Sequence, residues 1–272
     1  MTTVPENLPT LSAGGHAADE GQACLMEYIS LIAGEKWSDK PACTHPVLAS
    51  AARLTNDRMY DNHRHLLVPL IGRLFGTDEG GTEEERKALN VSLAVFCAKS
   101  VRHLVKPENL NVADAAISAA ENWLANPTED AAANAKYAVT TASYSSAEPA
   151  ADATSPVLGT SDAYSSAEPA VDEAAYSSAK ASAATAFTKV GHESCASHAV
   201  ARAAIAVANY TTTAAERNSA LADNLSSLID EYDRLTGRTQ HREVKSEEFD
   251  DINRRLASIA AISPPIERVS WI

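Results

Sequence analysis

The chain has 272 residues, and its 36 Asp and Glu against 23 Lys and Arg give a formal net charge of -13. This length allows one large domain or two ordinary ones, with a core that needs neither a disulfide nor a metal for stability. No basic run interrupts the acidic sequence. A nucleic-acid partner is therefore not expected, because contact with phosphates needs positive charge gathered on one face.

The first residues, MTTVPENLPTLSAGG, lack the basic and apolar segments of a secretion signal, and nowhere do 18 apolar residues run together. We therefore expect neither secretion nor a membrane span. The cysteines Cys24, Cys43, Cys97 and Cys195 lie far apart in the chain. Such spacing is typical of a reducing compartment, where thiols are core residues or ligands. The sequence predicts a cytoplasmic location.

Residues 1–126 are predicted to form a compact N-terminal helical domain. A first helix starts at Asp19, which has Gln22 at capping-box spacing, and stops at Gly34. A second starts near Thr44 and has Pro46 in its first turn. Both have apolar residues at helical spacing, which predicts one buried face for each helix.

Three further helices complete this domain. One runs from about Asp61 to Gly76. The next begins with Thr82 and Glu85 as a capping box, and the last starts at Asn111. No alternating apolar pattern bounded by turn residues is found, so the sequence predicts an all-α protein with an N-terminal helical bundle.

Residues 127–193 are rich in Ala and Ser, and a YSSA unit recurs at Tyr144, Tyr164 and Tyr176. The unequal intervals argue against a strict solenoid, which needs a fixed period. The composition fits either a flexible linker or short, closely packed helices in which each Tyr supplies one large contact. We favour the short helices.

Residues 194–272 contain the clearest periodicity. Val200, Val207, Ala214 and later leucines recur every seven residues, which predicts a long helix that ends at Gly237 and carries the Ala-rich helices. A short closing helix follows over about 246–262. The partner of the long helix is either the Ala-rich region or a second subunit. A homo-oligomer would use the seam residues Leu221, Leu225, Leu228, Tyr232 and Leu235.

One short stretch, residues 14–46, gathers residues that can bind metals. His16, Cys24, Cys43 and His45 are the residue types of a tetrahedral zinc site, but their spacing lacks the usual tight pairs. The alternative, which we favour, is a rigid metal-free elbow in which Cys24, Cys43 and Trp37 come together. No cofactor is then needed.

The segment GEKWSDKPACTHP is predicted to be a loop, and Ser38 and Asp39 ahead of Pro41 form a turn signal. Trp37, beside Glu35 and Asp39, is either one wall of a pocket or a plug that locks the first two helices together. No hydrolase, zinc-protease, Walker or dinucleotide-binding motif is present. His192, Cys195 and His198 share one side of a helical segment, but no orienting partner for them is identifiable.

The segment GHAADEGQACLMEYISLIAGEKWSDKPACTHPVLASAARLTND, residues 15–57, resembles uncharacterised proteins of actinobacteria and their phages. Those proteins share G-H, E-G, C-x-M-E, A-G-E, W-S-D, P-x-C-T-H-P and N-D in this order, and LIDEYDRLTGR is a weaker second likeness. The family has no assigned activity, so the resemblance implies no catalytic residue. It implies a phage or actinobacterial accessory protein in the bacterial host cell, with these binding residues: Glu20, Glu27, Glu35, Trp37, Ser38, Asp39, Asn56 and Asp57.

Three functions follow as hypotheses. The favoured one is a non-enzymatic accessory protein, of a host-takeover or anti-defence type, that binds a host protein or sequesters a small signalling molecule. The second is a metal-dependent hydrolase that uses the neighbourhood of His16, Glu20 and Cys43. The third is a structural or assembly component of a virion, in which the C-terminal seam would mediate assembly.

Overall fold

A computed structural model gives the fold of the chain. It describes residues 10–78, 80–105, 107, 109–145, 196–197, 199–201, 203–206, 211 and 213–262, without the side chains of 136 and 139–145. Helices are the regular elements of these residues, and no strand occurs among them. The predicted all-α class is therefore confirmed. Within the same residues, no helix is both long enough and apolar enough to cross a membrane.

The N-terminal half supplies most of the elements. In chain order they are α1 (Leu25–Ile32), α2 (Pro46–Arg58), the 3-10 helix η1 (Asp61–Leu70), α3 (Ile71–Leu74), α4 (Glu83–Val101), the 3-10 helix η2 (Arg102–Leu104), α5 (Leu110–Ala125) and α6 (Glu129–Ser145). The C-terminal part supplies α9 (Ala214–Thr236) and α10 (Ser246–Ile262). Parts of residues 196–206 are also helical.

Several predicted helix ends are confirmed by the caps that hold them. The Thr82 side chain accepts a hydrogen bond from the backbone of Glu85, whose carboxylate accepts one from the Thr82 backbone in return, so α4 begins with the predicted capping box. Pro46 is the first residue of α2, and α9 ends at Gly237 in the left-handed conformation. The closing helix covers 246–262, as predicted.

The predicted start of the first helix at Asp19 is wrong. The helix begins at Leu25, with Cys24 as its N-cap and the Glu27 carboxylate bonded to the Cys24 backbone. Gly21 has φ +69, a conformation that interrupts a right-handed helix. Residues 10–24 therefore form a loop that contains no helix and lies against α1.

Two other helices differ from the prediction. Residues 61–76 form η1 and then the short α3, and Pro69 inside η1 has no backbone N–H to donate. The single long helix expected from residue 194 is interrupted, because α9 has its own N-cap at Thr213 with Glu216 completing a capping box. The seven-residue pattern thus continues across a helix boundary.

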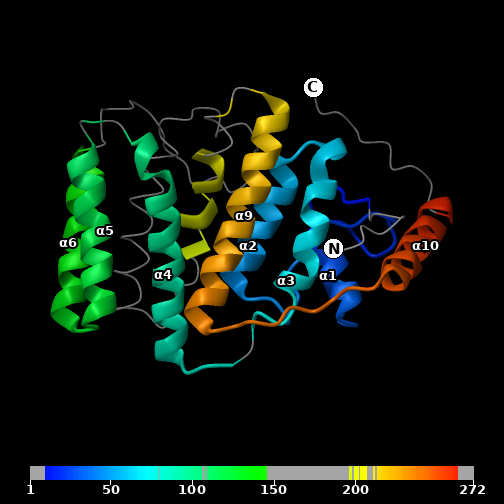
Figure 1. Cartoon of the computed structure of the whole chain (residues 1–272), viewed down its shortest axis with the longest axis horizontal. Coiled ribbons are helices and arrows are strands. Elements are labelled where there is room, and N and C mark those ends of the chain that lie inside the picture. The colour runs from blue at the N-terminus through cyan, green and yellow to red at the C-terminus, as the bar shows by residue number, and fades with distance from the viewer. Residues whose placement is uncertain are drawn as a thin grey trace.

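The layers are seen in Figure 1, where α9 lies across the middle of the molecule beside α2 and α4. The helices α5 and α6 stand at one end, and α10 lies at the other end beside α1. One large core cluster contains side chains from Leu11 to Leu256, so the N-terminal helices share it with α9 and α10. A smaller cluster around Trp123 joins α4, α5 and the start of α6.

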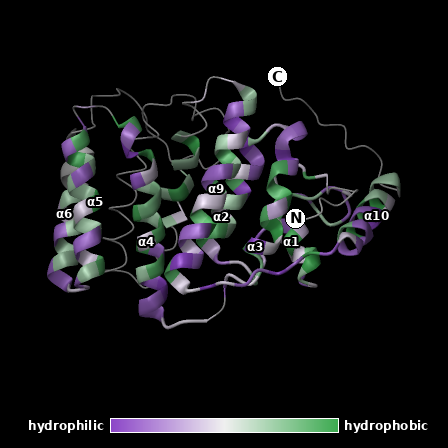
Figure 2. Cartoon of the chain, viewed as in Figure 1, coloured by the Kyte–Doolittle hydropathy of each residue, from purple (hydrophilic) through white to green (hydrophobic). Residues whose placement is uncertain are grey.

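The periodic seam of α9 is buried inside one chain. Its main contacts are with α2, η1 and α4, and Figure 2 shows hydrophobic and hydrophilic residues side by side along it. Leu221 is 0 % exposed, Leu225 and Leu228 are 1 % exposed, and Tyr232 is 6 % exposed, while Leu235 packs against the core. Four of these side chains are buried and Leu235 is partly buried, so the chain itself covers most of the seam proposed for a homo-oligomer.

Of residues 127–193, for which short Ala-rich helices are predicted, the structure describes those up to the end of α6. Among the described residues just before α9, Ala196, Ala199, Ala203, Ala204 and Ala206 are buried in the large core, where small side chains let backbones approach closely. The first repeat tyrosine belongs to the end of α6, but its side chain is outside the described residues, as are the other two repeat units. His192, Cys195 and His198 also lie outside them.

Candidate functional site

Glu27 is the centre of the stretch that the sequence singles out. Its side chain is 2 % exposed, yet both carboxylate oxygens have partners. One accepts the backbone N–H of His16 at 2.7 Å; the other accepts that of Cys24 at 2.8 Å and lies 2.9 Å from the His16 ring nitrogen Nδ1. A buried carboxylate needs several such donors to offset its lost hydration. Glu27 therefore ties the loop of residues 10–24 to the first turn of α1.

Trp37 fixes the same loop from a second side. Its indole N–H donates to the backbone oxygen of His16 at 2.7 Å, and its half-buried ring packs against the core. Ser30 donates to the Glu27 backbone oxygen and accepts from the Ser38 backbone N–H. This arrangement fits the interpretation of Trp37 as a packing residue and not as the wall of a pocket.

Glu35 and Asp39 close the loop between α1 and α2. The Glu35 carboxylate accepts the backbone N–H groups of Ala42 at 2.7 Å and Cys43 at 2.9 Å. Arg53 of α2 donates to the Asp39 backbone oxygen at 2.8 Å and lies 3.6 Å from its carboxylate. Glu35 and Arg53 thus hold the backbone of this loop in place.

Asn56 and Asp57, at the end of α2, also bind backbone groups of neighbouring segments. The buried Asn56 amide accepts from the Leu25 backbone and donates to the Ser12 backbone oxygen at 2.7 Å, while Asp57 accepts from the Gly14 backbone at 2.7 Å. Arg64, 4 % exposed, donates to the backbone oxygens of Asn56 and Met59. Most residues predicted to bind a ligand therefore have their polar groups engaged with backbone, which makes the loop of residues 10–24 rigid.

Glu20, the remaining predicted binding residue, lies in a turn of this loop. Its backbone N–H donates to the oxygen of Ala17, and its side chain is half-buried. The hydrolase hypothesis required Glu20, His16 and Cys43 to act together. His16 instead pairs with Glu27, and the Cys43 backbone is bound by Glu35.

The four residues proposed as zinc ligands are all described, and they do not form one metal site. No group of three or more His, Cys, Asp or Glu side chains within the described part of the chain is placed to hold a metal ion. Burial raises the pKa of the Cys24 thiol to about 12 and also raises the pKa of Cys43. Both thiols are therefore protonated at neutral pH in this metal-free structure, whereas a nucleophilic cysteine is a thiolate. His45 is buried against the ring of Tyr232 at 5.5 Å.

His45 makes the stability of the protein depend on pH. Burial lowers its pKa from 6.5 to about 4, and its Nδ1 atom is buried without a hydrogen-bond partner. Because the folded pKa lies below the unfolded one, the unfolded state binds the proton first as the pH falls. The full contribution to stability is present above pH 6.5 and is lost between pH 6.5 and about 4.

We expect this to cost about 2 kcal/mol between pH 7.5 and 5. Urea unfolding of the His45→Gln variant at both pH values measures the contribution, and the variant should lose less stability on acidification than the wild type. His63→Gln is the matched control, because His63 is only half-buried and bonds its neighbour Asn62. Equal pH dependence of His45→Gln and wild type would contradict this assignment.

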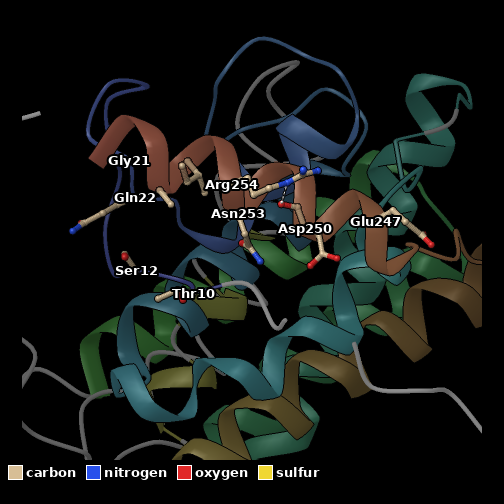
Figure 3. A pocket seen from close by; sticks show the side chains of 10 residues that line it. Thr10, Ser12, Gly21, Gln22, Glu247, Asp250, Asn253 and Arg254 are labelled. Atoms are coloured by element: carbon tan, nitrogen blue, oxygen red, sulfur yellow. Dashed lines mark hydrogen bonds between the residues drawn. The ribbon is translucent and has the colours of Figure 1, made fainter. Parts of the chain in front are cut away.

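A groove lies between the loop of residues 10–24 and α10, and we call it the loop–α10 groove (Figure 3). Its volume is about 1000 Å³. The loop wall is lined by Thr10, Ser12, Gly21 and Gln22. The helix wall is lined by Glu247, Asp250, Asn253, Arg254, Leu256 and Ala257. In Figure 3, Asp250 and Asn253 point from α10 into the space in front of Thr10 and Ser12.

Two residues set the distance between these walls. The Tyr28 hydroxyl of α1 lies 3.2 Å from both the Phe249 backbone oxygen and the Asn253 side-chain oxygen, and burial raises the Tyr28 pKa so that the hydroxyl stays a donor. Gly21 lies so close to α10 that an added Cβ would be 2.4 Å from the backbone nitrogen of Ala260. The Asn253 oxygen is therefore held by Tyr28, which leaves its amide N–H groups to face the groove.

Sequence reasoning missed the α10 residues of this groove. Nothing in SEEFDDINRRLASIAAI distinguishes a groove wall from the exposed side of an ordinary amphipathic helix. The glycine at position 21 was the available signal, but its close approach to Ala260, far along the chain, is seen only in the fold.

No protein-family model, curated protein or solved structure matches this chain. The likeness of residues 15–57 to actinobacterial and phage proteins therefore remains a prediction. The functional argument depends on the geometry above.

Proposed function

We propose that the chain is a non-enzymatic binding protein that takes a small molecule, or a short segment of a host protein, in the loop–α10 groove. The observation that carries this proposal is the groove itself, whose volume of about 1000 Å³ is that of a small-molecule site. Its rigid wall is held by Glu27, Trp37 and Asn56. A rigid wall lowers the entropy that binding must overcome.

The lining favours a polar ligand that is neutral or positively charged. Glu247 and Asp250 provide carboxylates, and Arg254 of the same wall pairs with Asp251 at 3.4 Å. Asn253 offers hydrogen-bond donors, while Leu256 and Ala257 give the groove an apolar part. An anionic ligand would face this acidic wall in a chain whose formal net charge is -13.

The chemistry of residues 14–46 fits binding without catalysis. Glu27 and Glu35 of this stretch bind backbone N–H groups, and the thiols of Cys24 and Cys43 are protonated, so neither these carboxylates nor these thiols are poised as a general base or a nucleophile. The setting of a phage or actinobacterial accessory protein in the bacterial cytoplasm is part of the same proposal. It is supported by the resemblance of residues 15–57 and by the acidic composition.

Filling the groove tests the proposal. Ala257 lines it and is exposed, so Ala257→Trp should occupy the space without disturbing the core. Ser258→Trp is the matched control, since Ser258 is an exposed neighbour that does not line the groove. We expect native mass spectrometry of protein purified from an actinobacterial host to show a retained ligand on wild type and Ser258→Trp. The Ala257→Trp variant should lose it. Equal retention by both variants, or none by wild type, would contradict the proposal.

A further inference from the structure

The connection between α9 and α10 is anchored firmly in its first half. After Gly237 ends α9, Arg238 donates to the Arg73 backbone oxygen at 2.7 Å. Arg242 donates from its backbone to Gly72 at 3.2 Å and from its side chain to the Ile32 backbone oxygen at 3.0 Å. Its guanidinium also lies 4.4 Å from the centre of the Phe75 ring. The chain is therefore fixed to the bundle up to Arg242.

The second half of the connection is held much less. Residues 243–245 belong to no helix, and Glu243 and Lys245 are exposed, while the half-buried side chain of Val244 between them packs against the large core. An ion pair between Arg242 and Glu248 crosses this stretch, but both side chains are about one-third exposed, where such pairs add little. Glu248 also accepts the Lys245 backbone N–H at 3.0 Å, which caps α10 at its own start. Residues 243–245 thus have the features of a hinge beside a self-contained helix.

The docking of α10 depends on few contacts. Phe249, Ile252 and Leu256 are buried, and α1 is its principal helical neighbour. Tyr28 supplies the hydrogen bonds, and its ring lies 5.9 Å from that of Phe249. By comparison, α9 packs on three elements and buries a longer apolar face. Elements with fewer buried contacts open at lower free energy than the core.

We propose that α10 is a hinged wall of the loop–α10 groove, which undocks and re-docks as one helix about residues 243–245 while the bundle stays folded. Tyr28 is the positioning residue that sets the docked fraction. This inference rests on the proposed function for its biological use, because the groove exists only when α10 is docked. A ligand that touches both walls stabilises the docked state, and loss of docking weakens that ligand by the same factor.

Native-state hydrogen exchange of the full chain, without any ligand, measures the opening directly. We expect the amides of α10 to exchange at least tenfold faster than those of α9. We also expect low concentrations of urea to accelerate α10 less than α9, because a small opening exposes less surface than global unfolding.

Tyr28→Phe tests the positioning residue while keeping its ring. Loss of one buried hydrogen bond raises the free energy of the docked state, so it should raise the exchange of α10 about fivefold. The exchange of α9 should rise by a similar factor, because global unfolding also breaks this contact. Tyr60→Phe is the matched control, because Tyr60 is half-exposed and lies away from α10, and it should change neither helix. These results need no ligand, so they stand or fall separately from the ligand retention tested with Ala257→Trp.

The proposal is overturned if α10 and α9 exchange with the same free energy and the same urea dependence, since α10 would then open only with the whole bundle. It is also overturned if Tyr28→Phe accelerates α9 and leaves α10 unchanged. In that case the Tyr28 contacts would persist while α10 opens, and Tyr28 would not set the docking of α10.

Discussion

Replacing Glu27 by Ala should destabilise the protein by about 3–5 kcal/mol, the usual cost of removing one partner from a buried charged network. The change leaves the backbone N–H groups of His16 and Cys24 without their acceptor inside the protein. It also removes the partner of the His16 ring. Since folded domains are stable by about 5–15 kcal/mol, a loss of this size is large. Urea unfolding followed by circular dichroism measures it.

Glu85→Ala is the matched control for this variant. Glu85 makes the same kind of capping-box contact, to the Thr82 backbone at 2.7 Å, but at the exposed start of α4. We expect a much smaller loss there, because water replaces the missing acceptor. Similar losses for the two variants would show that burial of Glu27 has no special role. Glu27→Gln, which preserves the shape of the side chain, should fall between wild type and Glu27→Ala.

Gly21→Ala is expected to displace α10. An Ala here adopts φ +69 at a cost of about 1–2 kcal/mol, and its Cβ would lie 2.6 Å from the Cβ of Ala260 as well as against the backbone. Overpacking of this kind costs about another 1–3 kcal/mol. Because the neighbour is helix backbone, α10 must move. We expect its hydrogen exchange to rise more than tenfold.

Gly34→Ala separates the two causes. Gly34 has nearly the same conformation, φ +70, but nothing lies within 4 Å of an added Cβ. Gly34→Ala should therefore lose only the stability that the left-handed backbone conformation costs, and α10 should stay docked. If Gly34→Ala accelerated exchange in α10 as much as Gly21→Ala does, the close approach of Gly21 to Ala260 would not be what holds the helix.

Local signals in the sequence predicted much of the fold. These signals depend on neighbours a few residues away: the capping box at Thr82, the Pro at the start of α2 and the Gly after α9. The capping box at Thr213 is a signal of the same kind, but it was overlooked because the seven-residue pattern ran through it. The start of the first helix was misplaced because a second capping-box spacing lies nearby. Asp19 and Gln22 have the right spacing, but Glu27 caps Cys24 instead.

The candidate site was predicted in part. The sequence pointed to Glu27, Trp37 and Asn56, but their types suggest ligand binding and backbone anchoring equally well, and only their hydrogen bonds distinguish the two. The other wall of the groove could not be predicted. The apolar spacing of Phe249, Ile252 and Leu256 predicts a buried face on α10, but it does not say that α1 and the loop of residues 10–24 cover it.

Hydrogen exchange can locate a bound molecule in the most direct way. The chain purified from actinobacterial cells is compared with the same chain after unfolding, removal of bound molecules and refolding. Binding in the loop–α10 groove predicts slower exchange in the purified form at residues 10–24 and 246–262, with α5 and α6 unchanged. Protection centred on α5 and α6, or no difference between the two forms, would contradict the groove as the binding site.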